Sequence, residues 1–454
     1  MQRRPAPGIS RLPLTAAQLR LAAAATCAAV SFAIYFPGAL DPDSTTQLQE
    51  ALSGRFTDWH PPIMAAFWRL LGNIAPGPAP LLAVHVGLYW LGVWALWDAA
   101  ARRGGWRQIL PLIAMAHPLM LVMLGAIQKD VGLAASLSAA FGLLYRQRSL
   151  GRPLSIAKSV IVGVLLAYAV LVRWNGALAA GPLLLWWIAP ESVRAGRAII
   201  VTALLGLVMV PAASFVDHSM LKASRTHAQA SLELFDMAGI AHFSGDRALL
   251  DVPPGCYRPY FWDPLDSPQC GHLFERLAAT DEGASALTRR WLEAIATHPL
   301  AYATHRLAYF NSSTAFAVSP TLRCQSAPDY TGCEQPRARQ IVNDFVKKNL
   351  LYWPCLWLAA GGWLLVRGRA DPGPRALAWS GMIYGLGYFL IGVATDWRYY
   401  LWTTLAIALA LALHFASVEE DGRGFKQLKE LLLAVAPVVV AGYAARLLFV
   451  IAGS

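Results

Sequence analysis

Charged side chains are scarce in this sequence: Asp, Glu, Lys and Arg make up 14% of its 454 residues, whereas 56% are hydrophobic. An average soluble domain carries roughly 25% charged residues, so the composition excludes an ordinary soluble protein and predicts a polytopic membrane protein. The sequence also lacks a G-x-G-x-x-G loop and a phosphate-binding loop with lysine, which are the usual signatures of nucleotide sites. Its histidines show no H-E-x-x-H or other compact ligand spacing, which argues against a zinc site.

Eleven apolar segments reach or approach the roughly 20 residues that a spanning helix needs. The first is too long for the apolar core of a signal peptide, so we expect it to be retained. The fourth, sixth and tenth are the shortest. The sequence thus predicts an all-α bundle of about eleven transmembrane helices, near residues 18–37, 79–99, 108–126, 131–146, 154–172, 176–190, 198–216, 351–367, 376–394, 401–416 and 431–450.

The formal net charge of +11 comes largely from short loops between these segments. Short loops rich in Lys and Arg stay in the cytoplasm, so this charge indicates orientation and gives no reason to expect a nucleic-acid partner. All the basic loops fall on one side if eleven spans are counted, which places the N-terminus in the cytoplasm. These loops contain Arg3, Arg4, Arg11, Arg102, Arg103, Arg107, Arg146, Arg148, Arg152, Arg194, Arg197, Arg367, Arg369, Arg375, Arg423, Lys426 and Lys429.

The opposite, outer side receives two longer segments and three short turns. Residues 38–78 form the first outer loop, which belongs to an N-terminal membrane module, 1–216. Residues 217–350 are too polar to span the membrane and too long for a plain connection, so they predict a small, mainly helical outer domain. Residues 351–454 form the C-terminal membrane module.

Outside the spans, three stretches have apolar residues at helical spacing: 63–75, 231–241 and 287–310. The first predicts an amphipathic helix at the membrane interface, with Trp68 and Arg69 as anchors. The other two are the expected helices of the outer domain.

Four of the six cysteines lie in the outer domain and allow three pairings. We favour the two local pairs, which would place this domain in an oxidising compartment. These pairs are Cys256 with Cys270 and Cys324 with Cys333.

The first outer loop places two carboxylates directly after the first span, in the sequence Asp41-Pro42-Asp43-Ser44. Asp43 is the candidate general base. Asp41 is the candidate turn former, because Asp-Pro-Asp-Ser is also a good helix N-cap sequence. A divalent metal is a possible cofactor and would use these two carboxylates as ligands; a diphosphate donor would favour it, whereas a monophosphate donor would not require it. His60 could bond Asp43 or the acceptor, although a plain interfacial histidine fits equally. Other polar residues of the loop are candidate substrate contacts: Ser44, Gln47, Asp58 and Trp59.

The three outer turns carry charges with no polar spacer before the next apolar segment. Charged groups at membrane depth are costly and usually face a cavity or a partner, although snorkelling and an aromatic belt would explain any single turn. Lys129, Arg173 and Arg398 are three cations that could converge on one anion near the outer membrane surface. Further candidate substrate contacts are Gln128, Asp130, Asn175, Asp396 and Tyr399 in the turns, and Arg306 on a helix that leads back to the membrane.

This combination of groups suits a lipid-linked phosphate donor, whose anion lies at that depth while its tail stays in the bilayer. A carboxylate can deprotonate an acceptor hydroxyl, and cations can stabilise the departing phosphate. Glycosyl transfer from a polyprenyl-phosphate sugar needs these two functions and no nucleotide.

Several short motifs also occur in a fixed order: Phe36-Pro37-Gly38, Asp43-Ser44 with Gln47, Asp58-Trp59-His60-Pro61-Pro62, Lys129-Asp130, Arg173 with Asn175-Gly176, and Arg398-Tyr399. Together they resemble a bacterial branch of the GT-C superfamily of membrane glycosyltransferases, over most of the membrane part. The resemblance implies a GT-C-like bundle in the bacterial inner membrane, with its active site facing the periplasm. It also implies an inverting transferase that uses a polyprenyl-phosphate-linked sugar.

On this resemblance, Asp43 carries over as the base, and Lys129, Arg173 and Arg398 as donor-phosphate contacts. The sequence departs from oligosaccharyltransferases in one respect. Its outer domain lies between the seventh and eighth spans and is not a large C-terminal globule, so a glycan, a lipid or a protein of the cell envelope remains open as the acceptor.

Two other functions fit parts of the pattern. An O-antigen ligase or polymerase would use a polyprenyl-diphosphate donor and active residues in the long outer segment, namely Arg289, Arg290, His298, His305 and Arg306. A transporter or flippase for a lipid-linked substrate would have repeated halves and charges near the bilayer middle, whereas the charges here lie toward one side.

Overall fold

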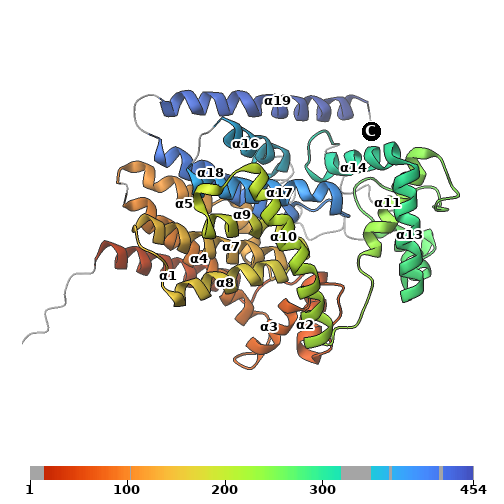
Figure 1. The fold of residues 1–454 in the computed structure, drawn as a ribbon, viewed down its shortest axis with the longest axis horizontal. Coiled ribbons are helices and arrows are strands. Elements are labelled where there is room, and N and C mark those ends of the chain that lie inside the picture. Colours follow the sequence, from red (N-terminus) through yellow and green to blue (C-terminus); the bar gives the residue numbers. More distant parts are fainter. Residues whose placement is uncertain (1–14, 103, 319–348, 368–370, 419–422, 453–454) are drawn as a thin grey trace, which may run out of the picture.

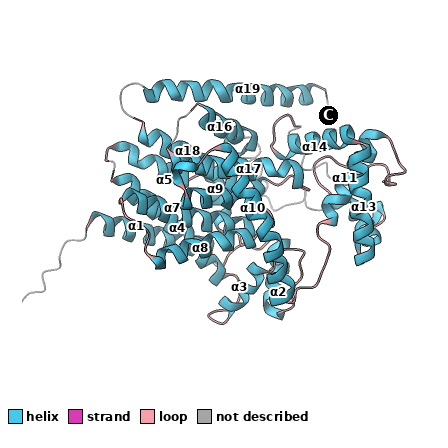
Figure 2. Ribbon diagram, viewed as in Figure 1, coloured by secondary structure: helices cyan, strands magenta, loops and turns pink. Residues whose placement is uncertain are grey.

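The structure is a computed structural model that describes residues 15–102, 104–318, 349–367, 371–418 and 423–452. Within these ranges the regular structure is helical, and only isolated bridges replace strands (Figure 2). The helices α11, α13 and α14 lie at one end of the main bundle, α2 and α3 at its lower edge, and α19 along its upper edge (Figure 1). The sequence therefore predicted the all-helical class correctly.

The main bundle consists of apolar helices. Its members are α1 (Ala16–Tyr35), α4 (Ala79–Ala101), α7 (Lys129–Ser149), α8 (Ile156–Leu171), α9 (Gly176–Ile188), α10 (Ala195–Ser214), α16 (Pro354–Val366), α17 (Pro372–Ile391), α18 (Leu401–Ser417) and α19 (Arg423–Ile451). Glycine allows a close contact between α4 and α7. A Cβ atom on Gly92 would lie 2.8 Å from the backbone of Ser138, and one on Gly142 would lie 2.9 Å from the Gly92 carbonyl oxygen. Such small-residue contacts are typical of helix packing in membranes.

Five helical segments of the described residues are long and apolar enough to cross a membrane: Ala16–Tyr35, Ala79–Ala101, Ala195–Met220, Trp397–Ser417 and Arg423–Ile451. The expected span at 108–126 is instead a pair of helices, α5 (Leu110–Met115) and α6 (Pro118–Leu124), which follow a short 3₁₀ turn, η1 (Trp106–Ile109). The pair bends by 50°, because Pro118 cannot continue the hydrogen bonding of α5. Counting this pair gives up to six spans, so the number eleven stays a prediction.

Two of the candidate spans have almost no protein cover. Only 6% of the most apolar window of α10 and of α19 is buried, and large side chains such as Leu207, Val210 and Val440 are 73%, 72% and 67% exposed. Contiguous apolar surface of this size is rare on a soluble protein. It fits a lipid environment around these helices.

The outer segment contains four helices: α11 (Ala230–Ser244), α12 (Leu273–Ala278), α13 (Asp281–Thr297) and α14 (Pro299–Ser313). The first three pack around a small core of their own. Leu234, Met237 and Leu287 are buried there. The expected single helix over 287–310 was wrong, since α13 ends at Thr297 and Pro299 starts a new helix.

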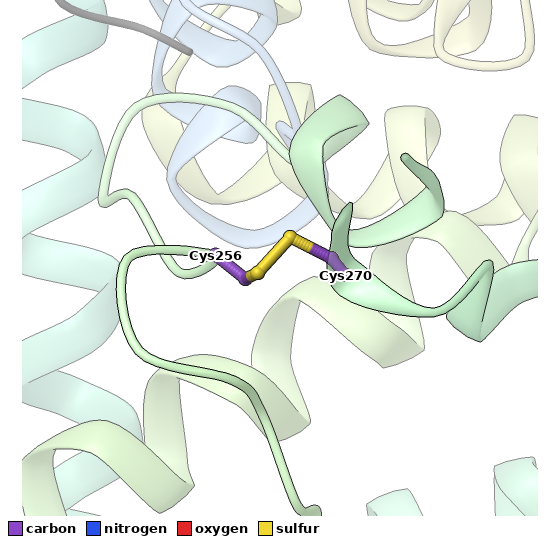
Figure 3. Close-up of a disulfide and its surroundings, with 2 residues drawn as sticks. All are labelled: Cys256 and Cys270. Atoms are coloured by element: carbon purple, nitrogen blue, oxygen red, sulfur yellow. A yellow bond between two sulfur atoms is a disulfide. The ribbon is translucent and has the colours of Figure 1, made fainter. Parts of the chain in front are cut away.

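A disulfide joins Cys256 to Cys270 in this segment, with their Cα atoms 5.8 Å apart, as expected from the sequence (Figure 3). The other expected pair, Cys324 with Cys333, lies outside the described residues.

The first outer loop contains two helices, α2 (Pro42–Ser53) and α3 (Ile63–Gly72). The expected interfacial role of Trp68 was wrong, because this side chain is only 1% exposed and its ring N–H donates to the Gly77 carbonyl. Arg69 donates to the Ala51 carbonyl at the end of α2. Helix α3 is therefore held against α2 and the bundle core.

Asp98 links three bundle helices at the end opposite the outer segment. Its side chain is fully buried and receives Arg20 of α1 at 2.7 Å, Arg146 of α7 at 2.8 Å and Arg102 of its own helix at 3.2 Å. One carboxylate thus compensates three guanidinium groups, each of which remains partly exposed.

Replacing Asp98 with Asn should destabilise the bundle, because three arginines then converge without a counter-charge. Loss of one partner from a buried ion pair costs on the order of 3 kcal/mol. The measurement is the temperature at which half of the purified protein in detergent remains monodisperse. Asp251→Asn, which changes an exposed carboxylate, is the matched control, and equal melting of the two variants would contradict the prediction.

Candidate functional site

The start of α2 brings the two first-loop carboxylates together. Asp41 is the N-cap: its Oδ1 accepts hydrogen bonds from the Ser44 backbone N–H at 2.8 Å and from the Ser44 hydroxyl at 2.6 Å. Pro42 occupies the first helical position, where its missing N–H costs nothing. Asp43 lies in the first turn, so both carboxylates sit at the positive end of the helix dipole.

Arg398 joins these carboxylates to a distant part of the chain. It lies in a 3₁₀ turn, η8 (Trp397–Tyr400), that leads into α18. One guanidinium nitrogen lies 2.7 Å from Asp41 Oδ2, a second lies 3.0 Å from Asp43 Oδ2, and Nε lies 2.9 Å from Asp396. Gln128 also donates to Asp41 Oδ2, at 2.6 Å. We call Asp41, Asp43, His60, Lys129, Asp396 and Arg398 the aspartate cluster.

Lys129, the first residue of α7, and His60 complete the aspartate cluster. Lys129 Nζ lies 3.5 Å from Asp43 Oδ2 and 2.7 Å from His60 Nδ1. Because the ammonium group can only donate, Nδ1 must accept, which leaves the His60 proton on Nε2. That nitrogen lies 3.7 Å from Asp43 Oδ1.

The surroundings in the aspartate cluster lower the pKa values of both Asp43 and His60. Burial alone would raise the pKa of Asp43, but Lys129, Arg398 and His60 outweigh this effect and lower it to about 2. Burial and the positive charge of Lys129 lower the pKa of His60 to about 3. At neutral pH the cluster therefore holds an ionised Asp43 beside an uncharged His60.

Arg173 lies in a layer behind the aspartate cluster. It forms a buried ion pair with Asp130 and hydrogen bonds with Asn175 at 3.2 Å and Tyr388 at 3.0 Å. The Tyr399 ring links the two layers, because the guanidinium carbons of Arg173 and Arg398 lie 5.0 and 5.6 Å from its centre. Of the three predicted cations, two contact the aspartates and Arg173 braces the layer behind them.

Several residues predicted to contact the substrate instead bond or pack against other parts of the protein. Asp58 accepts from the Thr226 backbone N–H and hydroxyl, both at 2.6 Å. Trp59 packs its ring against Trp262 and Phe274 of the outer segment. Ser44 bonds Asp41, and the Gln47 amide donates to the Asp43 carbonyl at 3.3 Å. These residues shape the loop around the cluster.

Arg306 lies apart from the aspartates, in a fully buried group with Asp236 at 2.5 Å and His305. It donates to the Gly392 carbonyl at 2.7 Å, and Tyr309 donates to the Ala394 carbonyl at 3.0 Å. The Trp262 backbone N–H donates to the Val393 carbonyl at 3.0 Å. The outer segment thus holds the chain that leads to Asp396 and Arg398.

Of the five residues that an O-antigen ligase would use, only His305 and Arg306 lie together, where both contact Asp236. Arg289 and Arg290 are exposed on α13, and His298 approaches Asp246 at 3.8 Å. His305 is buried against Asp236 with no exposed surface.

Asp263, which the sequence reasoning missed, lies on the outer segment near Asp43. Its side chain is exposed to solvent, and partial desolvation together with the charge of Asp43 raises its pKa. The one signal in the sequence is that Asp263-Pro264 repeats the Asp-Pro step of Asp41-Pro42.

The charges of the site nearly balance. Four carboxylates, on Asp41, Asp43, Asp130 and Asp396, face three cations, on Lys129, Arg173 and Arg398.

Among the described residues no group of three or more His, Cys, Asp or Glu side chains is placed to hold a metal ion. A hollow of about 270 Å³ lined by Arg148, Trp186 and Asp371 lies at the other end of α7, about 30 Å away for a helix of 21 residues.

Comparison with protein-family models, curated proteins and solved structures finds no match.

The low pKa of His60 leads to a prediction about how the stability of the fold depends on pH. An unfolded His titrates near 6.5, whereas folded His60 titrates at about 3, so only the unfolded state takes up this proton as pH falls below 6.5. Stability is therefore lost on acidification from about pH 7 to about pH 4.5. The contribution of Asp43 is lost only below 3.8, outside this window.

His60→Gln should reduce this loss, because Gln keeps an acceptor for Lys129 and does not titrate. The measurement is the difference in melting temperature between about pH 7 and about pH 4.5 for wild type and variant. His272→Gln is the control, since His272 is exposed. A His60→Gln profile as steep as that of the wild type would refute the assigned protonation state.

Proposed function

We propose that this protein is an inverting glycosyltransferase that moves a sugar from a polyprenyl-phosphate donor to a cell-envelope acceptor. The observation that carries the proposal is the meeting of Asp41, Asp43, His60, Lys129 and Arg398 in one cluster. These residues come from the first outer loop, the start of α7 and the turn before α18. A set of ionisable groups gathered from such distant segments, and still partly open to solvent, is a functional-site candidate.

The cluster supplies the two functions that the reaction needs. Lys129 and Arg398 bind the donor phosphate and stabilise the charge that develops on it as the sugar leaves. A carboxylate of the site takes the proton of the acceptor hydroxyl. Asp43, which matches the first-loop aspartate of the GT-C enzymes that the sequence resembles, is the first candidate for this role.

The membrane arrangement that goes with this function is part of the proposal. It comprises a GT-C-like bundle of about eleven spans in the bacterial inner membrane, a cytoplasmic N-terminus and a periplasmic outer domain. Three observations support it: the apolar helices long enough to cross a membrane, the position of the cluster at the end of α7 that faces the outer segment, and the Cys256–Cys270 disulfide, which favours an oxidising compartment.

The direct test is transfer by the purified protein in lipid nanodiscs. Radiolabelled polyprenyl-phosphate sugars are incubated with glycan, lipid and protein fractions of the cell envelope, and label is followed from the donor into a covalent product. A ligase would require a diphosphate donor, and a transporter would move label across vesicles without a product. If the lipid keeps its label in the presence of every envelope fraction, the proposal fails.

Arg398→Gln should lower kcat/KM on the order of 100-fold, the usual effect of removing one group that stabilises transition-state charge. Asp251→Asn, on an exposed loop of the outer segment, should leave transfer unchanged. Size-exclusion elution and melting temperature of both variants establish that they are folded. If folded Arg398→Gln transfers sugar at the wild-type rate, Arg398 has no role in the reaction.

A further inference from the structure

The ion-paired residues around Asp98 carry more positive than negative charge. Arg20 donates to Asp98 Oδ1 through two nitrogens, at 2.7 and 3.1 Å, and Arg146 and Arg102 donate to Oδ2 at 2.8 and 3.2 Å. Within the described residues no other carboxylate pairs with these three side chains. Two positive charges therefore remain uncompensated. We call Arg20, Arg102 and Arg146 the arginine group.

The arginine group keeps hydrogen-bond donors that no protein atom takes. A guanidinium group has five N–H donors in a rigid fork, and Asp98 uses Nε and Nη2 of Arg20, Nε of Arg146 and Nη2 of Arg102. In the part of the chain that the structure describes, the other guanidinium nitrogens have no partner, and none of them is a buried atom. The three side chains are 20%, 20% and 38% exposed. These free donors can therefore reach a ligand outside the protein.

Three helix ends hold the arginine group in place. Helices α1 and α7 both pack against α4 (Figure 1). Arg20 lies in the second turn of α1, whereas Asp98 and Arg146 lie in the last turns of α4 and α7. The Arg146 guanidinium also covers the Trp94 ring, with its carbon 4.6 Å from the ring centre. A site fixed in this way loses little conformational entropy when it binds a ligand.

The surface next to the arginine group is apolar. Leu19 and Leu21, on either side of Arg20, are 55% and 46% exposed, and only 11% of the most apolar window of α1 is buried. Cations near the end of a helix that crosses the membrane lie at the depth of the lipid headgroups. Snorkelling would place a single arginine at this depth, but it does not require three of them to converge on one buried carboxylate.

We propose that the arginine group binds the phosphate headgroup of an anionic phospholipid, whose acyl chains lie along α1. Guanidinium groups bind phosphate oxygens through paired N–H donors, and basic pockets between membrane helices bind anionic headgroups. Net charge selects the lipid, because a zwitterionic headgroup brings no net charge to two uncompensated cations. The site does not depend on the proposed transfer reaction, since it lies about 25 Å along α7 from Lys129.

Native mass spectrometry of the full chain can test this selectivity. The protein is titrated with phosphatidylglycerol, which is anionic, or phosphatidylcholine, which is zwitterionic, with the same acyl chains. The first phosphatidylglycerol should bind on the order of 10-fold more tightly, the effect of about one hydrogen bond to a charged group. Arg146→Gln and Arg102→Gln should each remove most of this preference. Asp98 keeps two arginine partners in either variant, and melting temperatures establish that both are folded.

The matched control is Arg197→Gln, which removes an exposed arginine at the start of α10, away from the arginine group. It should keep the wild-type preference for phosphatidylglycerol. If Arg146→Gln and Arg102→Gln also keep that preference, the inference is wrong. It is equally wrong if Arg197→Gln loses as much as they do, because the lipid would then respond to overall positive charge and not to this site.

A melting series distinguishes a lipid headgroup from free phosphate. Phosphatidylglycerol should raise the melting temperature of the wild-type protein in detergent, because a ligand that binds only the folded state stabilises it. Inorganic phosphate at the same concentration should not. Asp98→Asn leaves three positive charges uncompensated, so phosphatidylglycerol should stabilise this variant more than the wild type. Equal stabilisation by inorganic phosphate would overturn the assignment to a lipid, and a gain in Asp98→Asn no larger than in the wild type would overturn the anion site itself.

Discussion

The contacts of Arg398 with three carboxylates hold the site together. Asp41 and Asp43 start a helix of the first outer loop, whereas Asp396 and Arg398 precede α18, more than 350 positions along the chain. Among the residues that the structure describes, no other hydrogen bond or ion pair joins those two aspartates to this turn. Because the guanidinium group is planar and rigid, it fixes the orientation of the carboxylates as well as their separation. Asp43 in turn contacts Lys129 and His60.

Hydrogen bonds from the outer segment hold the chain that leads into the turn carrying Arg398. Arg306, Tyr309 and the Trp262 backbone each bond one of three successive carbonyls, on Gly392, Val393 and Ala394. Arg306 is buried without exposed surface and is compensated by Asp236, so it can hold its position only while the outer segment is folded. The disulfide, which lies in the same stretch as Trp262, constrains this segment further. The outer segment therefore belongs to the structural support of the site.

Local sequence patterns predicted much of the fold. Each apolar segment coincides with a helix or, at 108–126, with a bent pair, because length and hydropathy are local properties. Asp-Pro-Asp-Ser did form a helix N-cap. The burial of Trp68 and the pairing of Arg173 with Asp130 could not be read in this way, since both depend on which helices pack together. Asp263 was missed for the same reason: nothing near it in sequence indicates that the charge of Asp43 acts on its carboxyl group.

The charge balance limits how the proposed phosphate donor would bind. With His60 neutral, the four carboxylates and three cations leave one negative charge uncompensated. A phosphate can therefore contact Lys129 and Arg398 only by replacing a carboxylate as their partner. Asp396 is the better candidate to give way, because Asp41 is also held by Ser44 and Gln128 and Asp43 also faces Lys129 and His60. Such an exchange would release a carboxylate when the donor binds. Lys129 and Arg398 would then neutralise the phosphate in place of that carboxylate.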